Sequence, residues 1–391
     1  MKVSSLFYIC LFSFFFFQLA PILFYFVSPL VKQSLSFVQD PVEYFLYLIL
    51  SLACILFGYF LFASKKNPDS NIFSNINYRQ TFFWRTGEVL SIVFFLPCFF
   101  SSILIFKRLV VVGYGNAEIT TALETLFFYS HLMSLSFLFA GYTSDISPNK
   151  LLFYCALIIL PRFIITLSGP RFFVFQALLP FFIFIYPLYK AYILKNKIYI
   201  VSAFLLLIVL PYFTGNRVGE VSLIGVYIYG SPITYMWYYP VSNFFNTHLV
   251  TAGLFSSLFK IDLYDYKSFF DLGGYKIRFD WIYTRLTIGP EGTHHLGTGG
   301  NPIYEALTET TVGFILLFVI IGIICSVFDF HSPKLINRFL FPHIVAKIAF
   351  FWRGTFVELF DRAIVYTVIF FLAYIAFSRI NSKNENILPA Q

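Results

Sequence analysis

Long apolar runs separated by short polar connections recur along the chain from Leu6 to Phe377. A helix needs about 20 apolar residues to cross the hydrocarbon core of a bilayer. Segments that reach or approach this length lie at 5–29, 42–63, 88–106, 122–142, 151–168, 171–189, 198–213, 304–327, 341–357 and 363–378. The pattern predicts an all-α, polytopic membrane helix bundle of about ten transmembrane helices, with a tight hairpin near residues 151–189.

One connection is much longer than the others. Residues 214–303 lie between the seventh and eighth predicted helices and contain six Lys or Arg and six Asp or Glu, so their formal charge balances. Loops of this length are usually functional or disordered, and the aromatic content argues against disorder. We expect short amphipathic helices here, folded against the outer membrane surface. The chain thus divides into 1–213 (helices 1–7), the loop 214–303, and 304–391 (helices 8–10 and a C-terminal tail).

Composition supports the membrane assignment. Only 12% of the residues are charged, against about 25% in soluble domains, and the mean hydropathy is +0.77. The net charge of +8 fits cation-rich cytoplasmic loops, so no nucleic acid partner is inferred. The predicted connections and tails on one side hold most of the cations: Lys2, Lys65, Lys66, Arg79, Arg85, Lys150, Lys190, Lys195, Lys197, Lys334, Arg338, Arg379 and Lys383. The positive-inside rule places these, and both termini, in the cytoplasm.

The cysteines and the N-terminus change this picture little. All five cysteines fall inside apolar runs without metal-ligand spacing, which is typical of small buried hydrophobic residues. The N-terminal "LFYICLFSFFFFQLAPILFYF" is too long for a signal-peptide core and lacks a small-residue cleavage site, so we expect a retained first span. We expect no metal and no cofactor.

Several charges lie at membrane depth toward the non-cytoplasmic side, where the charge rule leaves cations scarce. Ionisable groups in the membrane are costly and indicate function by default. Arginines from four segments, which suit phosphate because the guanidinium offers paired donors, predict an anion site formed by Arg162, Arg171, Arg217 and Arg353. The alternatives are that Arg162 or Arg171 extends to lipid headgroups, and that Glu358 and Arg362 simply pair along a helix.

Glu305 and Glu309 are four residues apart and are expected on one face of the eighth helix. Two close carboxylates in a partly desolvated site repel, which raises the pKa of one and suits it to acid–base work. Asn301–Pro302 has the pattern of a helix start. Glu305 could therefore merely interact with the positive end of the helix dipole.

His294 and His295 lie in the glycine-rich run "GPEGTHHLGTGG" (289–300). Adjacent histidines diverge and cannot easily chelate one metal, and no third ligand is near in sequence. One of them, for which we take His294, could act as a base or contact a diphosphate; otherwise both are ordinary loop residues. The run lacks the GKS/T ending of a P-loop, so nucleotide binding is not predicted.

Three stretches carry a family resemblance: "SGPRFFVFQALLPFFIF" (168–184), "FTGNRVGE" (213–220) and "GTGGNPIYEALTETTVG" (297–313). Together with the large external loop, they resemble Wzy-type O-antigen polymerases, also described as oligosaccharide repeat-unit polymerases. The resemblance implies a multi-pass glycosyltransferase of the bacterial inner membrane. On the periplasmic side it would move a growing glycan from undecaprenyl diphosphate to the non-reducing end of a lipid-linked repeat unit.

The resemblance also implies residue roles. Arg171 and Arg217 would hold the lipid-linked diphosphate, and Glu305 or Glu309 would match the family's glutamate before a helix glycine, with Glu305 favoured because it lies closer to the interface. A chain-length regulator protein is a further implied partner. The alternatives are an O-antigen ligase, or a transporter or lipid flippase without covalent chemistry; a membrane O-acetyltransferase ranks low because no cytoplasmic acetyl-donor site is evident. Transporters often show repeated halves and charges at the bilayer midplane, neither of which this sequence predicts.

Overall fold

The structure is a computed structural model that describes residues 4–27, 41–62, 78–112, 121–143, 145–167, 172–198, 202, 248, 250–251, 254, 301–328, 335–354 and 356–385. These residues are helical with connecting turns and contain no strand, which confirms the predicted all-α class. The chain divides into two compact units. Unit 1 comprises residues 1–66, 218–327 and 347–361, and unit 2 comprises residues 67–217, 328–346 and 362–391.

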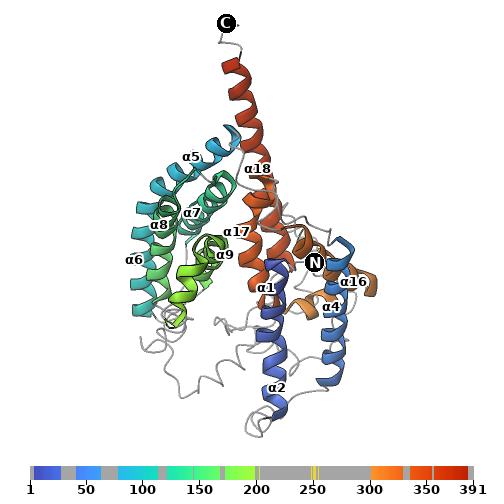
Figure 1. Cartoon of the computed structure of the whole chain (residues 1–391). Helices are drawn as coiled ribbons and strands as arrows, with labels where there is room; N and C mark the ends of the chain where they lie inside the picture. The colour runs from blue at the N-terminus through green and yellow to red at the C-terminus, as the bar shows by residue number, and fades with distance from the viewer. Residues whose placement is uncertain are drawn as a thin grey trace. The chain divides into compact units, whose positions relative to one another are not determined.

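Unit 1 combines the first part of the sequence with two later segments. Its N-terminal part is one continuous helical column of α1 (Ser5–Phe14), the π-helix η1 (Phe15–Leu19) and α2 (Ala20–Val27), followed by α4 (Pro41–Phe62) (Figure 1). Its later part contains the short helix α15 (Pro302–Leu307), α16 (Thr311–Val327) and the 3-10 helix η4 (Phe351–Arg353). Helix α15, which carries Glu305, packs against α4, α16 and η4 of the same unit.

Two glycines let α4 and α16 pack with their backbones in contact. A Cβ placed on Gly58 of α4 would collide with the carbonyl oxygen of Val319, and one placed on Gly322 of α16 would collide with that of Ile55. Small residues allow this close approach in membranes, where van der Waals contact replaces the hydrophobic effect as the source of helix association. The pair is completed by buried aromatic side chains, such as Phe314 and Phe318, on the inner face of α16.

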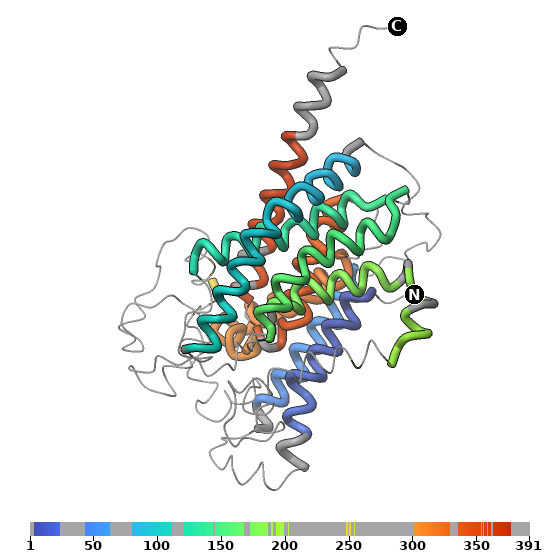
Figure 2. Tube along the Cα trace, turned by 90° about the vertical axis from the view of Figure 1, so that its left-hand side faces the viewer, coloured from blue at the N-terminus to red at the C-terminus, as the bar shows by residue number. Residues whose placement is uncertain are grey.

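Unit 2 contains α5 (Tyr78–Val93), α6 (Phe95–Val112), α7 (Ala122–Gly141), α8 (Pro148–Thr166) and α9 (Phe172–Lys195), with most of α17 (Leu335–Ala349) and of α18 (Phe356–Glu385). Helix α5 packs on α7, and α8 packs on both α6 and α9 (Figure 2). Gly87 and Gly141 lie at the α5–α7 contact, where an added Cβ would meet the backbone of Leu138 and Trp84.

Four described helices are long and apolar enough to cross a membrane: Ser5–Leu23, Tyr44–Phe62, Ala122–Gly141 and Pro148–Thr166. The pair Gln80–Val93 and Phe95–Val111, bent by 41°, would make a fifth if it is one span. Shorter apolar helices occur at Phe173–Tyr186, Thr311–Val327 and Ala363–Ala376. By length and composition, these helices are those of a helical membrane protein. The expected total of ten spans stays a prediction, because the predicted span 198–213 lies almost entirely outside the described residues.

The structure corrects the predicted layout at several places. Five cations expected in connections lie within helices: Arg79 and Arg85 in α5, Lys150 in α8, and Lys190 and Lys195 in α9. The third predicted span, 88–106, crosses the bend between α5 and α6 at Phe94. The ninth, 341–357, is instead α17, which begins at Leu335 and ends at Ala349, followed by η4. The eighth, 304–327, is broken into α15 and α16. Arg338, expected in a connection, lies inside α17, is buried, and donates to the carbonyl oxygen of Tyr142. Hydropathy averages over a window and therefore does not register such breaks.

Replacing Gly58 by valine should separate α4 from α16, because the new side chain meets backbone that cannot rotate away. Overpacking of this kind costs about 1–3 kcal/mol. The matched control is Ala53→Val, at an exposed position of the same helix. Thermal unfolding of the purified protein in detergent should show a lower midpoint for Gly58→Val only, and equal midpoints for the two variants would contradict the close packing.

Candidate functional site

The sequence around α15 encodes its own ends. The Asn301 side chain accepts a hydrogen bond from the Ile303 amide, and Pro302 occupies the first turn, which confirms the predicted helix start. At the other end, the Thr308 hydroxyl donates to the carbonyl oxygen of Glu305 at 2.6 Å. Two residues later, the Thr310 hydroxyl accepts from the Gly313 amide at 3.1 Å and so caps α16. Threonines that bond to nearby backbone favour such ends over a continuous helix.

This break separates the environments of the two glutamates. Their expected placement on one helical face depended on an unbroken helix across 304–327, and that expectation is wrong, because α15 ends at Leu307 and α16 begins at Thr311. Glu305 lies within α15, whereas Glu309 lies in the turn that follows it. Their carboxylates contact different partners.

Glu305 is buried, with only 2% of the residue exposed. Its Oε2 accepts a hydrogen bond from the backbone amide of Phe356, the first residue of α18, at 2.5 Å. A carboxylate at a helix N-terminus satisfies an otherwise unpaired amide and interacts favourably with the helix dipole. Glu305 lies in the first turn of α15, as the dipole alternative supposes, but its carboxylate contacts the start of a different helix, α18.

A chain of buried hydrogen bonds connects the start of α15 to the N-terminal column. Asn301 Nδ2 donates to Tyr44 Oη at 3.0 Å, and Tyr44 Oη donates to Gln18 Oε1 at 2.5 Å. Gln18, inside the π-helix η1, donates from Nε2 to the carbonyl oxygen of Trp352 at 2.7 Å. The Trp352 indole in turn donates to the carbonyl oxygen of Cys10 at 3.2 Å. Because buried polar groups are costly unless paired, this chain specifies one position for α15.

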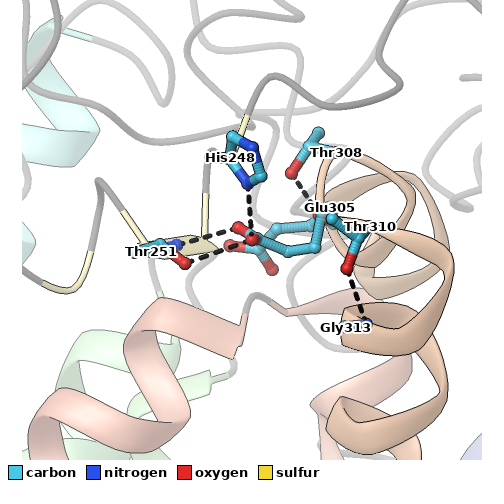
Figure 3. Close-up of polar contacts among 7 residues, drawn as sticks. His248, Thr251, Glu305, Thr308, Thr310 and Gly313 are labelled. Atoms are coloured by element: carbon cyan, nitrogen blue, oxygen red, sulfur yellow. Dashed lines mark hydrogen bonds and ion pairs between the residues drawn. The ribbon is translucent and has the colours of Figure 1, made fainter.

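Glu309 forms the second polar cluster, with residues of the long loop. Its Oε2 lies 3.1 Å from His248 Nδ1 and accepts from the Thr251 hydroxyl at 3.1 Å, and its Oε1 accepts from the Thr251 amide at 3.0 Å. Figure 3 shows His248 and Thr251 on the side away from Thr310 and Gly313. The side chain of Glu309 is 10% exposed and that of His248 is 50% exposed. The cluster therefore joins a sheltered carboxylate to an imidazole that solvent can reach.

His248 is held by its backbone as well. Its amide donates to the carbonyl oxygen of Thr308 at 2.7 Å. Its φ is 53°, and among the described residues it is the only non-glycine residue with positive φ. The sequence pattern did not single out this histidine. The available signal was a histidine immediately before the apolar patch "LVTAGLFSSLF" of the external loop.

Arg162 lies in unit 2, within α8, and is 1% exposed. Its guanidinium donates to the carbonyl oxygens of Ile158 at 2.7 Å and Phe128 at 2.6 Å. It also lies 3.5 Å from His131 Nδ1 and over the Phe128 ring. Within the part of the chain that the structure describes, no Asp or Glu forms a salt bridge with it. Its positive charge is thus buried among neutral partners.

The other predicted site residues are not placed. Arg171, Arg217 and His294 lie outside the described residues, as does the side chain of Arg353, whose backbone ends η4. The described residues contain no group of three or more His, Cys, Asp or Glu side chains that could hold a metal ion.

The first part of the chain matches a known protein family. The family model for O-antigen polysaccharide polymerase Wzy matches residues 1–227. The chain belongs to this family. Searches of curated proteins and of solved structures found no match. Membership supports a role in O-antigen polymerisation by a membrane protein that acts on lipid-linked oligosaccharide. The matched region includes Arg162 and ends before His248, Glu305 and Glu309.

We expect Glu305 of this Wzy-family protein to stabilise the fold. Glu305→Leu removes the acceptor for the Phe356 amide and should lower the free energy of unfolding by about 1–3 kcal/mol, because that amide is left buried and unpaired. Glu305→Gln keeps a carbonyl oxygen at the same place and should cost much less. Thermal unfolding in detergent measures both, and equal losses for Leu and Gln would show that the hydrogen bond is unimportant.

Proposed function

We propose that the protein polymerises undecaprenyl-diphosphate-linked oligosaccharide repeat units into O-antigen or a related surface polysaccharide. The reaction takes place at the periplasmic face of the bacterial inner membrane, with both termini in the cytoplasm. The observation that carries this proposal is the family match over residues 1–227. The carboxylate–imidazole contact beside α15 supports it, because transfer to a sugar hydroxyl needs a group that removes a proton.

The chemistry requires little beyond positioning and charge. A lipid diphosphate is a good leaving group once its developing negative charge is stabilised, and this electrostatic contribution is usually the largest in such reactions. The energy of the donor bond suffices, so no nucleotide is needed. A chain-length regulator protein would set how many units are added before release.

Of the two glutamates, Glu309 is the better candidate for the reaction centre. Glu305 is buried and its Oε2 already accepts from the Phe356 amide, so its carboxylate has a structural task. Glu309 lies in the turn outside the helices, beside a half-exposed imidazole. A titratable group that solvent reaches, held beside a carboxylate, is what proton transfer from an incoming hydroxyl requires.

The diphosphate is assigned to arginines. We propose Arg171, Arg217 and Arg353 as direct ligands, because the guanidinium fork matches phosphate oxygens. Arg162 is a further candidate, since a buried cation without a described acidic partner is costly and functional by default in a membrane protein. Its bonds to the carbonyl oxygens of Ile158 and Phe128 hold the side chain in one orientation.

Loss of the protein should leave the lipid A core capped with a single repeat unit. Complementation with the wild-type chain should restore the ladder of long chains on a gel of extracted lipopolysaccharide. In vitro, the purified protein in lipid vesicles should lengthen undecaprenyl-diphosphate-linked units. A deletion strain that attaches no unit to the core would instead indicate a ligase, and one that accumulates units on the cytoplasmic leaflet would indicate a flippase.

Arg171→Ala should abolish long chains and leave single capped units, because the donor diphosphate loses a cationic ligand. Arg162→Met should have the same effect on chain length. Because the carbonyl oxygens of Ile158 and Phe128 lose this donor, the amount of the variant in the membrane is measured alongside by immunoblot. The control is Lys195→Ala, which removes an exposed cation at the end of α9. A normal chain-length distribution in either arginine variant would remove that residue from the diphosphate site.

A further inference from the structure

We infer that His248 is the general base of the transfer reaction and that Glu309 is the positioning residue that orients its imidazole. This inference rests on the proposed function and adds to it the group that takes the proton. It is carried by the contacts at the α15–α16 turn, and His248 lies outside the region that the family model matches.

The contacts of Glu309 select one form of the imidazole. Thr251 donates to both carboxylate oxygens, through its amide and its hydroxyl, which fixes the carboxylate in place. The carboxylate oxygen Oε2 is then 3.1 Å from His248 Nδ1, a separation at which Nδ1 donates its proton. In a neutral imidazole, a proton on Nδ1 leaves the lone pair on Nε2. The ring therefore presents its basic nitrogen on the side away from Glu309.

The backbone of His248 also indicates a specialised position. A φ of 53° is uncommon outside glycine, although histidine is among the residues that tolerate it better, and such conformations gather at active sites. The conformation is held by the bond from the His248 amide to the Thr308 carbonyl oxygen. Thus the residue is attached by both backbone and side chain to the turn that follows α15, whose own position is set by the buried chain through Asn301.

Exposure distinguishes the two partners. Half of the His248 side chain is exposed, whereas the Glu309 side chain is 10% exposed. A sugar hydroxyl arriving from solvent therefore meets the imidazole before the carboxylate. A base oriented by a second group, which does not itself receive the proton, is a recurrent arrangement in nucleophile activation.

The acceptor hydroxyl transfers its proton to His248 Nε2 while its oxygen forms a bond to the anomeric carbon of the donor glycan. The bond from that carbon to the diphosphate oxygen breaks, and its electron pair leaves with undecaprenyl diphosphate. The imidazolium, stabilised by the Glu309 carboxylate, then releases its proton to solvent. No oxidant, reductant or nucleotide takes part.

A purely structural role is the competing explanation, because a histidine–glutamate pair of this exposure can attach a loop while contributing little else. His248→Asn separates the two. Asparagine tolerates positive φ, and its side-chain amide can donate to Glu309 as Nδ1 does, but it has no basic nitrogen. The variant should therefore unfold at the wild-type temperature while its kcat for chain extension falls on the order of 10²–10⁴-fold. KM for the lipid-linked unit should stay near the wild-type value.

The role of Glu309 is tested by a double-mutant cycle. Glu309→Gln should lower kcat by itself. If Glu309 acts only through the imidazole, the double variant carrying both His248→Asn and Glu309→Gln should be no slower than His248→Asn. Multiplied losses in the double variant would overturn the positioning role.

Assays of wild type and variants run side by side, in vesicles that contain the undecaprenyl-diphosphate-linked repeat unit. If the wild-type protein extends chains and the kcat of His248→Asn is strongly reduced, the inference is supported. Wild-type extension with an equally active His248→Asn overturns the base assignment and leaves the polymerase proposal standing, as does a loss that appears in KM alone. No extension by the wild-type protein overturns the polymerase proposal itself, and the base assignment with it.

Discussion

The hydrogen bond between Asn301 and Tyr44 is the contact on which the candidate site depends. Asn301 caps α15, and through Tyr44 and Gln18 it connects that short helix to the N-terminal column and to the backbone at Trp352. These side chains are buried away from water, which therefore cannot replace a lost partner, so the polar chain has one satisfied arrangement. A helix of one and a half turns could not hold its place alone. Anchored in this way, it holds the turn that carries Glu309.

The two threonines that follow α15 give neighbouring glutamates different tasks. Thr308 bonds back to α15 and Thr310 caps α16, so the chain turns between them. Glu305 remains inside and caps α18, and Glu309 is directed to the loop residues His248 and Thr251. Four residues of separation would place both carboxylates on one face of a continuous helix. The turn instead leaves one carboxylate to cap a helix and directs the other to the loop residues.

In both units, glycines at helix contacts allow the backbones to approach closely. Gly58 and Gly322 bring α4 and α16 together, and Gly87 and Gly141 do the same for α5 and α7. Between helices in lipid, close van der Waals contact is the main attraction available. Arg162 is a different case: within the part of the chain that the structure describes, its buried guanidinium contacts carbonyl oxygens and forms no salt bridge with a carboxylate. The family acts on lipid-linked oligosaccharide, and it is for the diphosphate of such a substrate that we propose Arg162.

The sequence by itself determined the helical membrane class, the family, and the start of α15 at Asn301–Pro302. These depend on local apolar length and on capping chemistry, which are readable from neighbouring residues. Only the tertiary structure decided that the eighth predicted helix breaks and that Glu305 caps a helix some fifty residues later in the chain. The same holds for the contact of His248 with Glu309, which lies 61 residues after it in the sequence. Hydropathy carries no information on such pairings, because they arise from how distant segments return in space.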